Sequence, residues 1–199
     1  MKILAFSDLH RDTNAAKKLC EASIDADILI GAGDFATKGK GGLETLRILA
    51  ESKAPVILVH GNHDSPSEVS DFCTQSDKLI YLHGTMARIE GLIFFGLGGE
   101  IPSRHPEKWN SFETEEHASK MLESCPKNAV LITHTPPYGV VDLQTTGKHE
   151  GSTAILEAIS KVKPRLHLCG HIHRAWGTSD KVGETIVHNL GPTLNWFEI

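Results

Sequence analysis

Aspartate, asparagine and histidine residues recur in short groups along this 199-residue sequence, and each group follows an apolar run. The members are Asp8, His10, Asp34, Asn62, His63, Asp64, His134, His171 and His173. Imidazole nitrogens with carboxylate and amide oxygens suit Mn²⁺, Fe or Zn²⁺, whereas a structural zinc site favours cysteine thiolates. The chemistry that these residue types predict is the binding of divalent metal ions.

Spacing within and between the groups supports this interpretation. Asp8 and His10 are two residues apart, and side chains at positions i and i+2 of an extended chain face the same way. The alternative, that Asp8 caps the helix expected over residues 11–22, leaves His10 without a role. Asp34 is expected to lie beside Asp8, where two carboxylates repel each other unless a cation lies between them.

The apolar runs predict the elements that position these groups. Buried strands are expected over residues 2–6, 28–30, 56–59, 92–97, 128–133 and 165–169, and closing strands over 185–190 and 193–197. Helices are expected over residues 11–22, 43–52, 65–75, 112–124 and 153–162. In open α/β sheets ligands bind beyond the carboxyl ends of strands, so we expect the polar groups to share one sheet edge.

A more ordinary explanation exists for each group taken alone. Residues 61–64 suit a polar turn, and a single histidine at a strand end is most often a hydrogen-bonded structural residue. Five such strand ends in one chain favour a common site.

The composition limits the class of protein. Hydrophobic residues make up 40% and charged residues 23%, as in an ordinary globular chain, and the length suits a single domain over residues 1–199. The net charge of -5 argues against nucleic-acid binding, which requires a basic surface. Four scattered cysteines suggest reduced thiols, and with no signal-peptide or membrane-spanning run we expect a cytoplasmic protein.

The groups occur in the order D-x-H, G-D, G-N-H-D, a lone H, and G-H-x-H, and they span residues 8–173. In this order they resemble the calcineurin-like metallophosphoesterase family. Residues 133–139 and 166–173 look most like its Icc-related and metallophosphoesterase-domain-containing branch. The resemblance implies an α/β fold, a four-layer α/β/β/α sandwich of two mixed sheets flanked by helices, with a two-metal site at the strand ends.

The resemblance also implies roles for individual residues. Asp8, His10 and His173 would hold the first ion, Asn62, His134 and His171 the second, and Asp34 would bridge them. The ions would hold an attacking hydroxide between them; Mn²⁺ is the expected metal, with Fe, Zn, Ni and Co as alternatives. His63 would protonate the leaving oxygen and stabilise developing charge, and Asp64 would orient or tune His63.

The function expected from these roles is hydrolysis of a small, nucleotide-like phosphodiester. A phosphomonoesterase with the same dinuclear site and a non-enzymatic scaffold of the same fold are the alternatives. Arg11 and His149 are the expected substrate contacts, with an exposed helix position as the alternative for Arg11. The expected partner is a small phosphoester substrate. We expect no membrane association, and a homo-oligomer is possible from the sequence.

Overall fold

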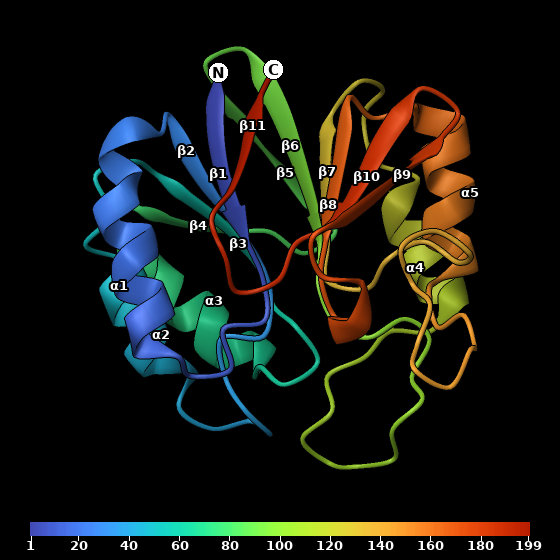
Figure 1. The fold of residues 1–199 in the computed structure, drawn as a ribbon, viewed down its shortest axis with the longest axis horizontal. Helices are drawn as coiled ribbons and strands as arrows, with labels where there is room; N and C mark the ends of the chain where they lie inside the picture. Colours follow the sequence, from blue (N-terminus) through green and yellow to red (C-terminus); the bar gives the residue numbers. More distant parts are fainter.

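The computed structural model describes residues 1–199 as two β-sheets packed face to face (Figure 1). The strands are β1 (Lys2–Phe6), β2 (Ile28–Ala32), β3 (Val56–Val59), β4 (Leu79–Tyr81), β5 (Thr85–Ile89), β6 (Leu92–Leu97), β7 (Val130–Thr133), β8 (Leu166–Cys169), β9 (Thr178–Val182), β10 (Thr185–Asn189) and β11 (Asn195–Glu198). The α-helices are α1 (Thr13–Ala22), α2 (Gly42–Leu49), α3 (Pro66–Thr74), α4 (Glu115–Leu122) and α5 (Thr153–Val162). Short 3₁₀ turns occupy Ser23–Asp25 and His173–Ala175.

Both sheets are mixed. The first has the order β11-β1-β2-β3-β4, in which only the β11–β1 pair is antiparallel. The second has the order β5-β6-β7-β8-β10-β9, with antiparallel pairs at its two edges. Helices α1 to α3 cover the outer face of the first sheet, and α4 and α5 cover that of the second (Figure 1).

Alternation along the strands produces the four layers. In β1, Ile3 and Ala5 face the second sheet, whereas Leu4 and Phe6 face the helices. Side chains alternate between the two faces of a strand, so a strand covered on both faces must be apolar throughout. The predicted α/β/β/α sandwich is confirmed, and the continuous apolar runs in the sequence have this physical origin.

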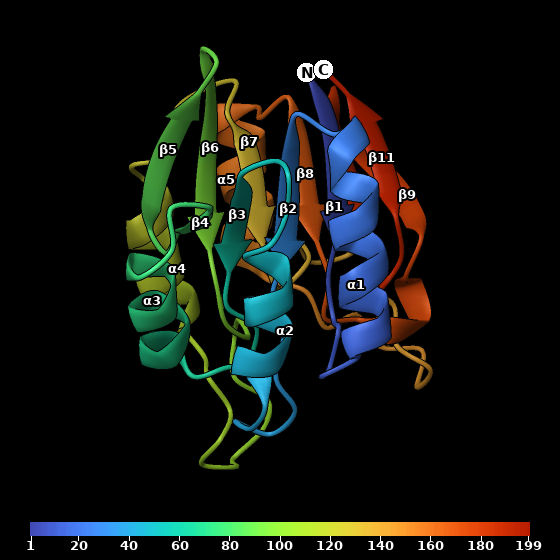
Figure 2. The same cartoon turned by 90° about the vertical axis from the view of Figure 1, so that its left-hand side faces the viewer.

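The parallel strands bring their carboxyl ends to one edge of the sandwich. The segments after β1, β2 and β3 in one sheet, and after β6, β7 and β8 in the other, gather there. Both views place the two termini at the opposite end (Figures 1 and 2). None of the helices is both long and apolar enough to span a bilayer.

Two local features differ from the expectation. Helix α1 begins at Thr13 because the Asp12 carboxylate accepts hydrogen bonds from the N–H groups of Asn14 and Ala15, each 2.9 Å long. Asp8 is therefore not its cap. Strand β9 was not anticipated, because its exposed, polar residues lack apolar alternation; backbone pairing with β10 forms it.

A buried histidine lies in β8. His167 has no solvent exposure, and its Nε2 lies 2.8 Å from the Thr133 hydroxyl. That hydroxyl donates its own proton to the Thr135 carbonyl, so the His167 ring must be the donor, while its Nδ1 has no partner. Burial lowers the pKa of His167 to about 3, which keeps the ring neutral in the folded protein.

We expect His167 to make stability depend on pH. The unfolded chain takes up a proton near pH 6.5 and the folded ring only near 3, so the free energy of unfolding should fall between these values as pH is lowered. The slope from this residue is about 1.4 kcal/mol per pH unit. The substitution His167→Gln keeps an N–H donor but removes the titratable ring. Urea unfolding of the metal-free variant at several pH values should show a shallower dependence of the free energy of unfolding on pH than in the wild type. An unchanged slope would contradict this account.

Candidate metal centre

Four of the predicted ligands have an unusual backbone conformation. The φ angles are 54° at Asp8, 44° at His10, 58° at Asp34 and 69° at His171, in the left-handed region that residues with a Cβ rarely adopt. Such strain persists only where the surrounding structure imposes it, and it clusters at functional sites.

Two glycines allow the loops to approach closely. A Cβ at Gly61 would overlap the Asp34 carboxylate, and one at Gly170 would lie 2.5 Å from Asp8 Oδ2 and from the Ser7 hydroxyl oxygen. The glycines of G-N-H-D and G-H-x-H are therefore needed for the neighbouring carboxylates to fit.

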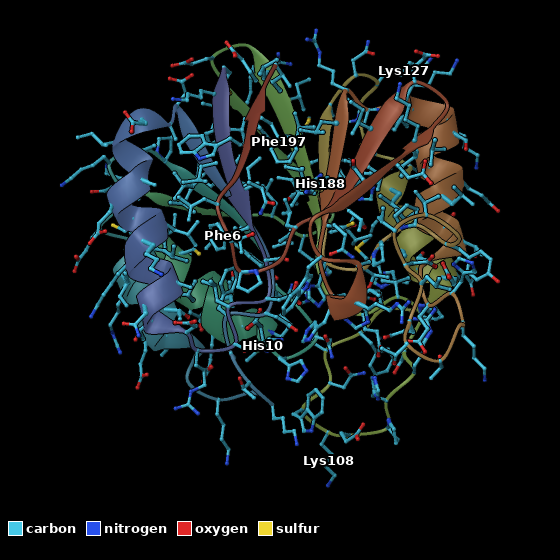
Figure 3. All side chains as sticks on the ribbon, in the orientation of Figure 1. Phe6, His10, Lys108, Lys127, His188 and Phe197 are labelled. Carbon is cyan, nitrogen blue, oxygen red and sulfur yellow. The ribbon has the colours of Figure 1, made fainter.

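The loops after β1 and β8 bring together Asp8, His10 and His173. Nε2 of His10 lies 3.1 Å from Nε2 of His173, which lies 3.7 Å from Asp8 Oδ1. All three ligand atoms lie within 4.8 Å of one another, close enough to hold a single ion. His10 is labelled in Figure 3 near this edge of the sandwich, whereas Lys127 lies at the far end.

A second group joins the loops after β3, β7 and β8. Asn62 Oδ1 lies 3.1 Å from both His134 Nε2 and His171 Nδ1. Asp34 lies between the two groups, with its Oδ2 at 3.6 Å from His10 Nε2 and 3.5 Å from His134 Nε2. The other oxygen, Oδ1, accepts a 2.8 Å hydrogen bond from the His63 N–H, so a single oxygen of Asp34 faces both groups.

The protonation of His134 shows that the second group suits a cation. Its Nδ1 faces the Ala32 carbonyl at 2.8 Å, and since a carbonyl only accepts, Nδ1 carries the proton. The lone pair on Nε2 then points at the oxygens of Asn62 and Asp34. Lone pairs directed at one another are unfavourable unless a positive ion lies between them. His10 repeats the pattern, with Nδ1 facing the Ala36 carbonyl at 3.2 Å.

The buried carboxylates of Asp34 and Asp8 also indicate that this site suits cations. Burial raises the pKa of Asp34 well above its usual range, and the negative charges of Asp64 and Asp8 raise it further. Burial also opposes ionisation of Asp8, but its interactions with His173, His134 and the Ser7 hydroxyl hold its pKa below the usual value. Divalent cations would stabilise both charged carboxylates. The donor set thus fits the two ions that the sequence predicted.

A pocket of about 410 Å³ opens over the second group. Besides predicted ligands it is lined by Lys38, His63, His105, Glu107, Trp109, Gln144 and Glu150. The His63 ring stacks on Trp109, with centroids 4.5 Å apart and planes at 32°. The structure therefore places His63 beside the ligands and facing a cavity that could hold a small substrate.

The tautomer of His63 follows from its neighbour. The backbone N–H of Lys38 donates to Nδ1 at 2.9 Å, so the neutral ring carries its proton on Nε2. Burial, with the nearby rings of His10 and His171, lowers the pKa of His63 to about 4. At neutral pH the ring is an uncharged N–H donor.

The Asp64 carboxylate, which was expected to orient or tune His63, makes its hydrogen bonds to backbone N–H groups and none to the His63 ring. Its Oδ2 accepts from the N–H groups of Asp34 and Gly61, each at 2.8 Å, and its Oδ1 from that of Ala36 at 2.7 Å. Burial raises the pKa of Asp64 to about 6 despite these hydrogen bonds. Its observed role is to tie the loop after β2 to the loop after β3.

The two expected substrate contacts lie outside the pocket. Arg11 lies against Gly41, and His149 donates from Nδ1 to Asp142 at 2.6 Å and lines a separate hollow with Arg174. Arg11 follows His10 with a left-handed backbone (φ 71°), and its side chain lies against Gly41 rather than in the pocket.

Sequence reasoning missed several residues of this region, among them Lys38, Glu100, Trp109 and Asn110. Glu100 offered one signal, since it follows the buried strand β6, as the predicted ligands follow their strands. Burial opposes ionisation of Glu100, yet its interactions with His171, the Arg104 N–H and Asn110 lower its pKa to about 2. The other three lie in loops without a recognisable pattern.

This fold, with aspartate, histidine and asparagine side chains converging at its strand ends, is that of a metal-dependent hydrolase. The chain belongs to the calcineurin-like phosphoesterase family, whose model matches residues 1–175. The predicted family and fold class are confirmed, and membership of this family supports the predicted metal-dependent phosphoric ester hydrolase. Members of the family use divalent metal ions, and the Asp and His groups described above could hold them.

Individual relatives share modest sequence identity. The chain is 27% identical to the UPF0046 protein K07C11.7 of Caenorhabditis elegans, over 94% of this chain and 69% of that protein. It is 24% identical to a cAMP/cGMP dual specificity phosphodiesterase of Mycobacterium tuberculosis, over 79% of this chain but 52% of the relative. The chain therefore spans between about half and two thirds of the length of these relatives.

A solved structure shows the same fold. TT1561 of Thermus thermophilus superposes with a TM-score of 0.77 at 22% identity, covering 98% of this chain and 97% of that one.

We expect Asp64→Ala to destabilise the loops that carry the site. Three backbone N–H groups would lose a buried acceptor, at about 1–3 kcal/mol each, so the free energy of unfolding should fall by about 3 kcal/mol or more. Metal affinity should fall as well, because Asp34 and Asn62 lie in the tied loops. Urea unfolding and metal titration would measure both, with Asp71→Ala on the exposed face of α3 as the control. Equal stability of the two variants would contradict the role given to Asp64.

Proposed function

We propose that this protein is a two-metal phosphodiesterase that hydrolyses a small, nucleotide-like phosphodiester. The observation that carries the proposal is the position of Asp34 Oδ2, at 3.6 Å from His10 Nε2 and 3.5 Å from His134 Nε2. One buried carboxylate oxygen is thus available to two separate donor groups. Mn²⁺ is the metal we propose, because oxygen and imidazole donors without thiolate suit it.

The metal-binding roles follow the two groups. Asp8, His10 and His173 would hold one ion, Asn62, His134 and His171 the other, and Asp34 both. When bound, the two cations supply Lewis-acid stabilisation of the phosphoryl charge and activation of the attacking water. The protein prepares these ligands through its backbone. The Nδ1–H groups of His10 and His134 donate to backbone carbonyls, so the Nε2 lone pair of each ring stays free to bind a metal ion.

His63 would act on the leaving group. With its Nδ1 held by the Lys38 N–H and its ring face against Trp109, it presents Nε2–H to the pocket. A hydrogen bond from this donor would stabilise the negative charge that develops on the leaving oxygen as its bond to phosphorus breaks. The low pKa of His63 favours this neutral donor over an imidazolium at neutral pH.

The charges of the pocket favour a diester. Lys38 is its one lysine or arginine, whereas Glu107 and Glu150 contribute two carboxylates. A phosphomonoester carries a second negative charge, which these carboxylates would repel. The names of two relatives support a nucleotide-like substrate, namely the dual specificity enzyme of Mycobacterium tuberculosis and a probable cyclic nucleotide phosphodiesterase of Synechococcus.

The reaction class can be tested with two chromogenic esters. With Mn²⁺ added, hydrolysis of bis(p-nitrophenyl) phosphate should be faster than that of p-nitrophenyl phosphate, and chelation should abolish both. Faster monoester hydrolysis would favour a phosphomonoesterase in which Lys38 binds the additional charge. Silence on both esters and on cyclic nucleotides, with two ions bound, would favour the scaffold alternative.

We expect His63→Ala to retain its metal but lose most of its turnover. His63 is absent from the ligand scheme above, so metal content by mass spectrometry should stay near wild type. The loss of one donor to a developing charge costs roughly 10²–10³ in kcat. His117→Ala, which removes an exposed histidine of α4, is the matched control. Full activity of His63→Ala would refute this assignment, and loss of metal would make His63 a ligand.

A further inference from the structure

Glu100 is a fully buried carboxylate that the scheme above does not use. Its Oε2 accepts hydrogen bonds from the Arg104 N–H at 3.0 Å and from Asn110 Nδ2 at 2.9 Å. Its Oε1 is also buried and has no hydrogen-bond partner. A buried charged oxygen without a donor is costly, so the groups that face it indicate what it is for.

One side of Glu100 fixes the orientation of two amides. An ionised carboxylate only accepts, so Asn110 must turn its NH₂ group toward Glu100 and its Oδ1 away, an orientation that the His105 carbonyl, 3.2 Å from Asn110 Nδ2, also favours. That Oδ1 accepts a 3.0 Å hydrogen bond from Asn62 Nδ2. Asn62 is thereby forced to present its own Oδ1 to His134 and His171, which is the orientation required of a metal ligand.

The other side of Glu100 faces His171. Oε1 lies 3.6 Å from His171 Nε2, slightly beyond hydrogen-bonding distance. The opposite ring nitrogen, Nδ1, lies 3.1 Å from Asn62 Oδ1 and belongs to the second donor group. If Nδ1 gives its lone pair to a cation, the proton must sit on Nε2, where the unpartnered Oε1 is the acceptor beside it.

A competing partner for Oε1 is His105, whose Nε2 lies 3.7 Å away. The His105 side chain is 50% exposed, against 9% for His171, and it also faces Glu107. Water can satisfy His105, but it has little access to His171. The buried oxygen is therefore better matched to His171.

We propose that Glu100 is a positioning residue that orients two ligands of the second ion at once, Asn62 through Asn110 and His171 directly. The proposal rests on the proposed two-metal function. It assigns the second donor group a single buried anion that sets both the amide orientation and the imidazole tautomer. A carboxylate that holds a metal-binding histidine in this way typically changes metal affinity about 10–100-fold when removed.

The substitution Glu100→Gln tests the His171 arm. The Arg104 N–H and the Asn110 NH₂ group keep the Gln oxygen at the Oε2 position, so the Gln NH₂ group must face His171 Nε2. Two donors would then oppose each other unless the His171 proton moves to Nδ1, where it blocks the metal. Titration with Mn²⁺, followed by calorimetry and metal analysis, should show the first ion retained and the second bound about 10–100-fold more weakly.

His105→Gln is the matched control, and it should bind two ions as the wild type does. Asn110→Ala tests the Asn62 arm and should also weaken the second ion alone. If circular dichroism and thermal unfolding show that Glu100→Gln does not fold, Asn110→Ala provides the test in its place. In the zinc-loaded wild type, ¹⁵N NMR should show a slowly exchanging proton on His171 Nε2, which a merely structural Glu100 would not require.

The outcomes separate the two proposals. Two ions bound with unchanged affinity in Glu100→Gln, or loss of the second ion in His105→Gln, would overturn the role of Glu100 and leave the two-metal function standing. A wild-type protein that binds fewer than two Mn²⁺ ions would overturn both.

Discussion

The convergence of buried acceptor atoms at one edge of the sandwich is the constraint on which the rest of the structure depends. Asp8 and Asp34 are buried side by side, and the lone pair of His134 points toward the oxygens of Asn62 and Asp34 rather than toward a donor. Such an arrangement destabilises a metal-free fold, because like charges and lone pairs repel at low dielectric. It becomes favourable when cations occupy the space between them, so metal binding and the stability of this edge are coupled.

The two sheets make this convergence achievable. Their parallel strands end at the same edge, and the apolar layer between them, with Ile30 and Val130 among its members, holds the strand ends at a constant spacing. The loops add what the sheets cannot supply. Gly61 and Gly170 let the backbones meet without a Cβ, and Asp64 ties two loops together through backbone N–H groups.

Backbone and buried anions, rather than the ligands themselves, determine the protonation of the site. Carbonyl groups keep the ligand nitrogens of His10 and His134 free, and the Lys38 N–H places the His63 proton on the side of the pocket. Glu100 completes this pattern for Asn62 and His171. In His10, His134 and His63, the position of the ring proton is thus set by a backbone group that can only accept or only donate.

The sequence by itself determined the buried strands, the order of the polar groups at their ends, and the family, because buried strands need apolar residues on both faces and because the groups follow those strands directly. Only the tertiary structure decided the partners of Asp64, the burial of Glu100, and the exclusion of Arg11 and His149 from the pocket. These depend on distances between loops that are far apart in the chain. Such distances are set by the packing of two sheets and by backbone angles such as the positive φ at Arg11, which no local pattern of residues encodes.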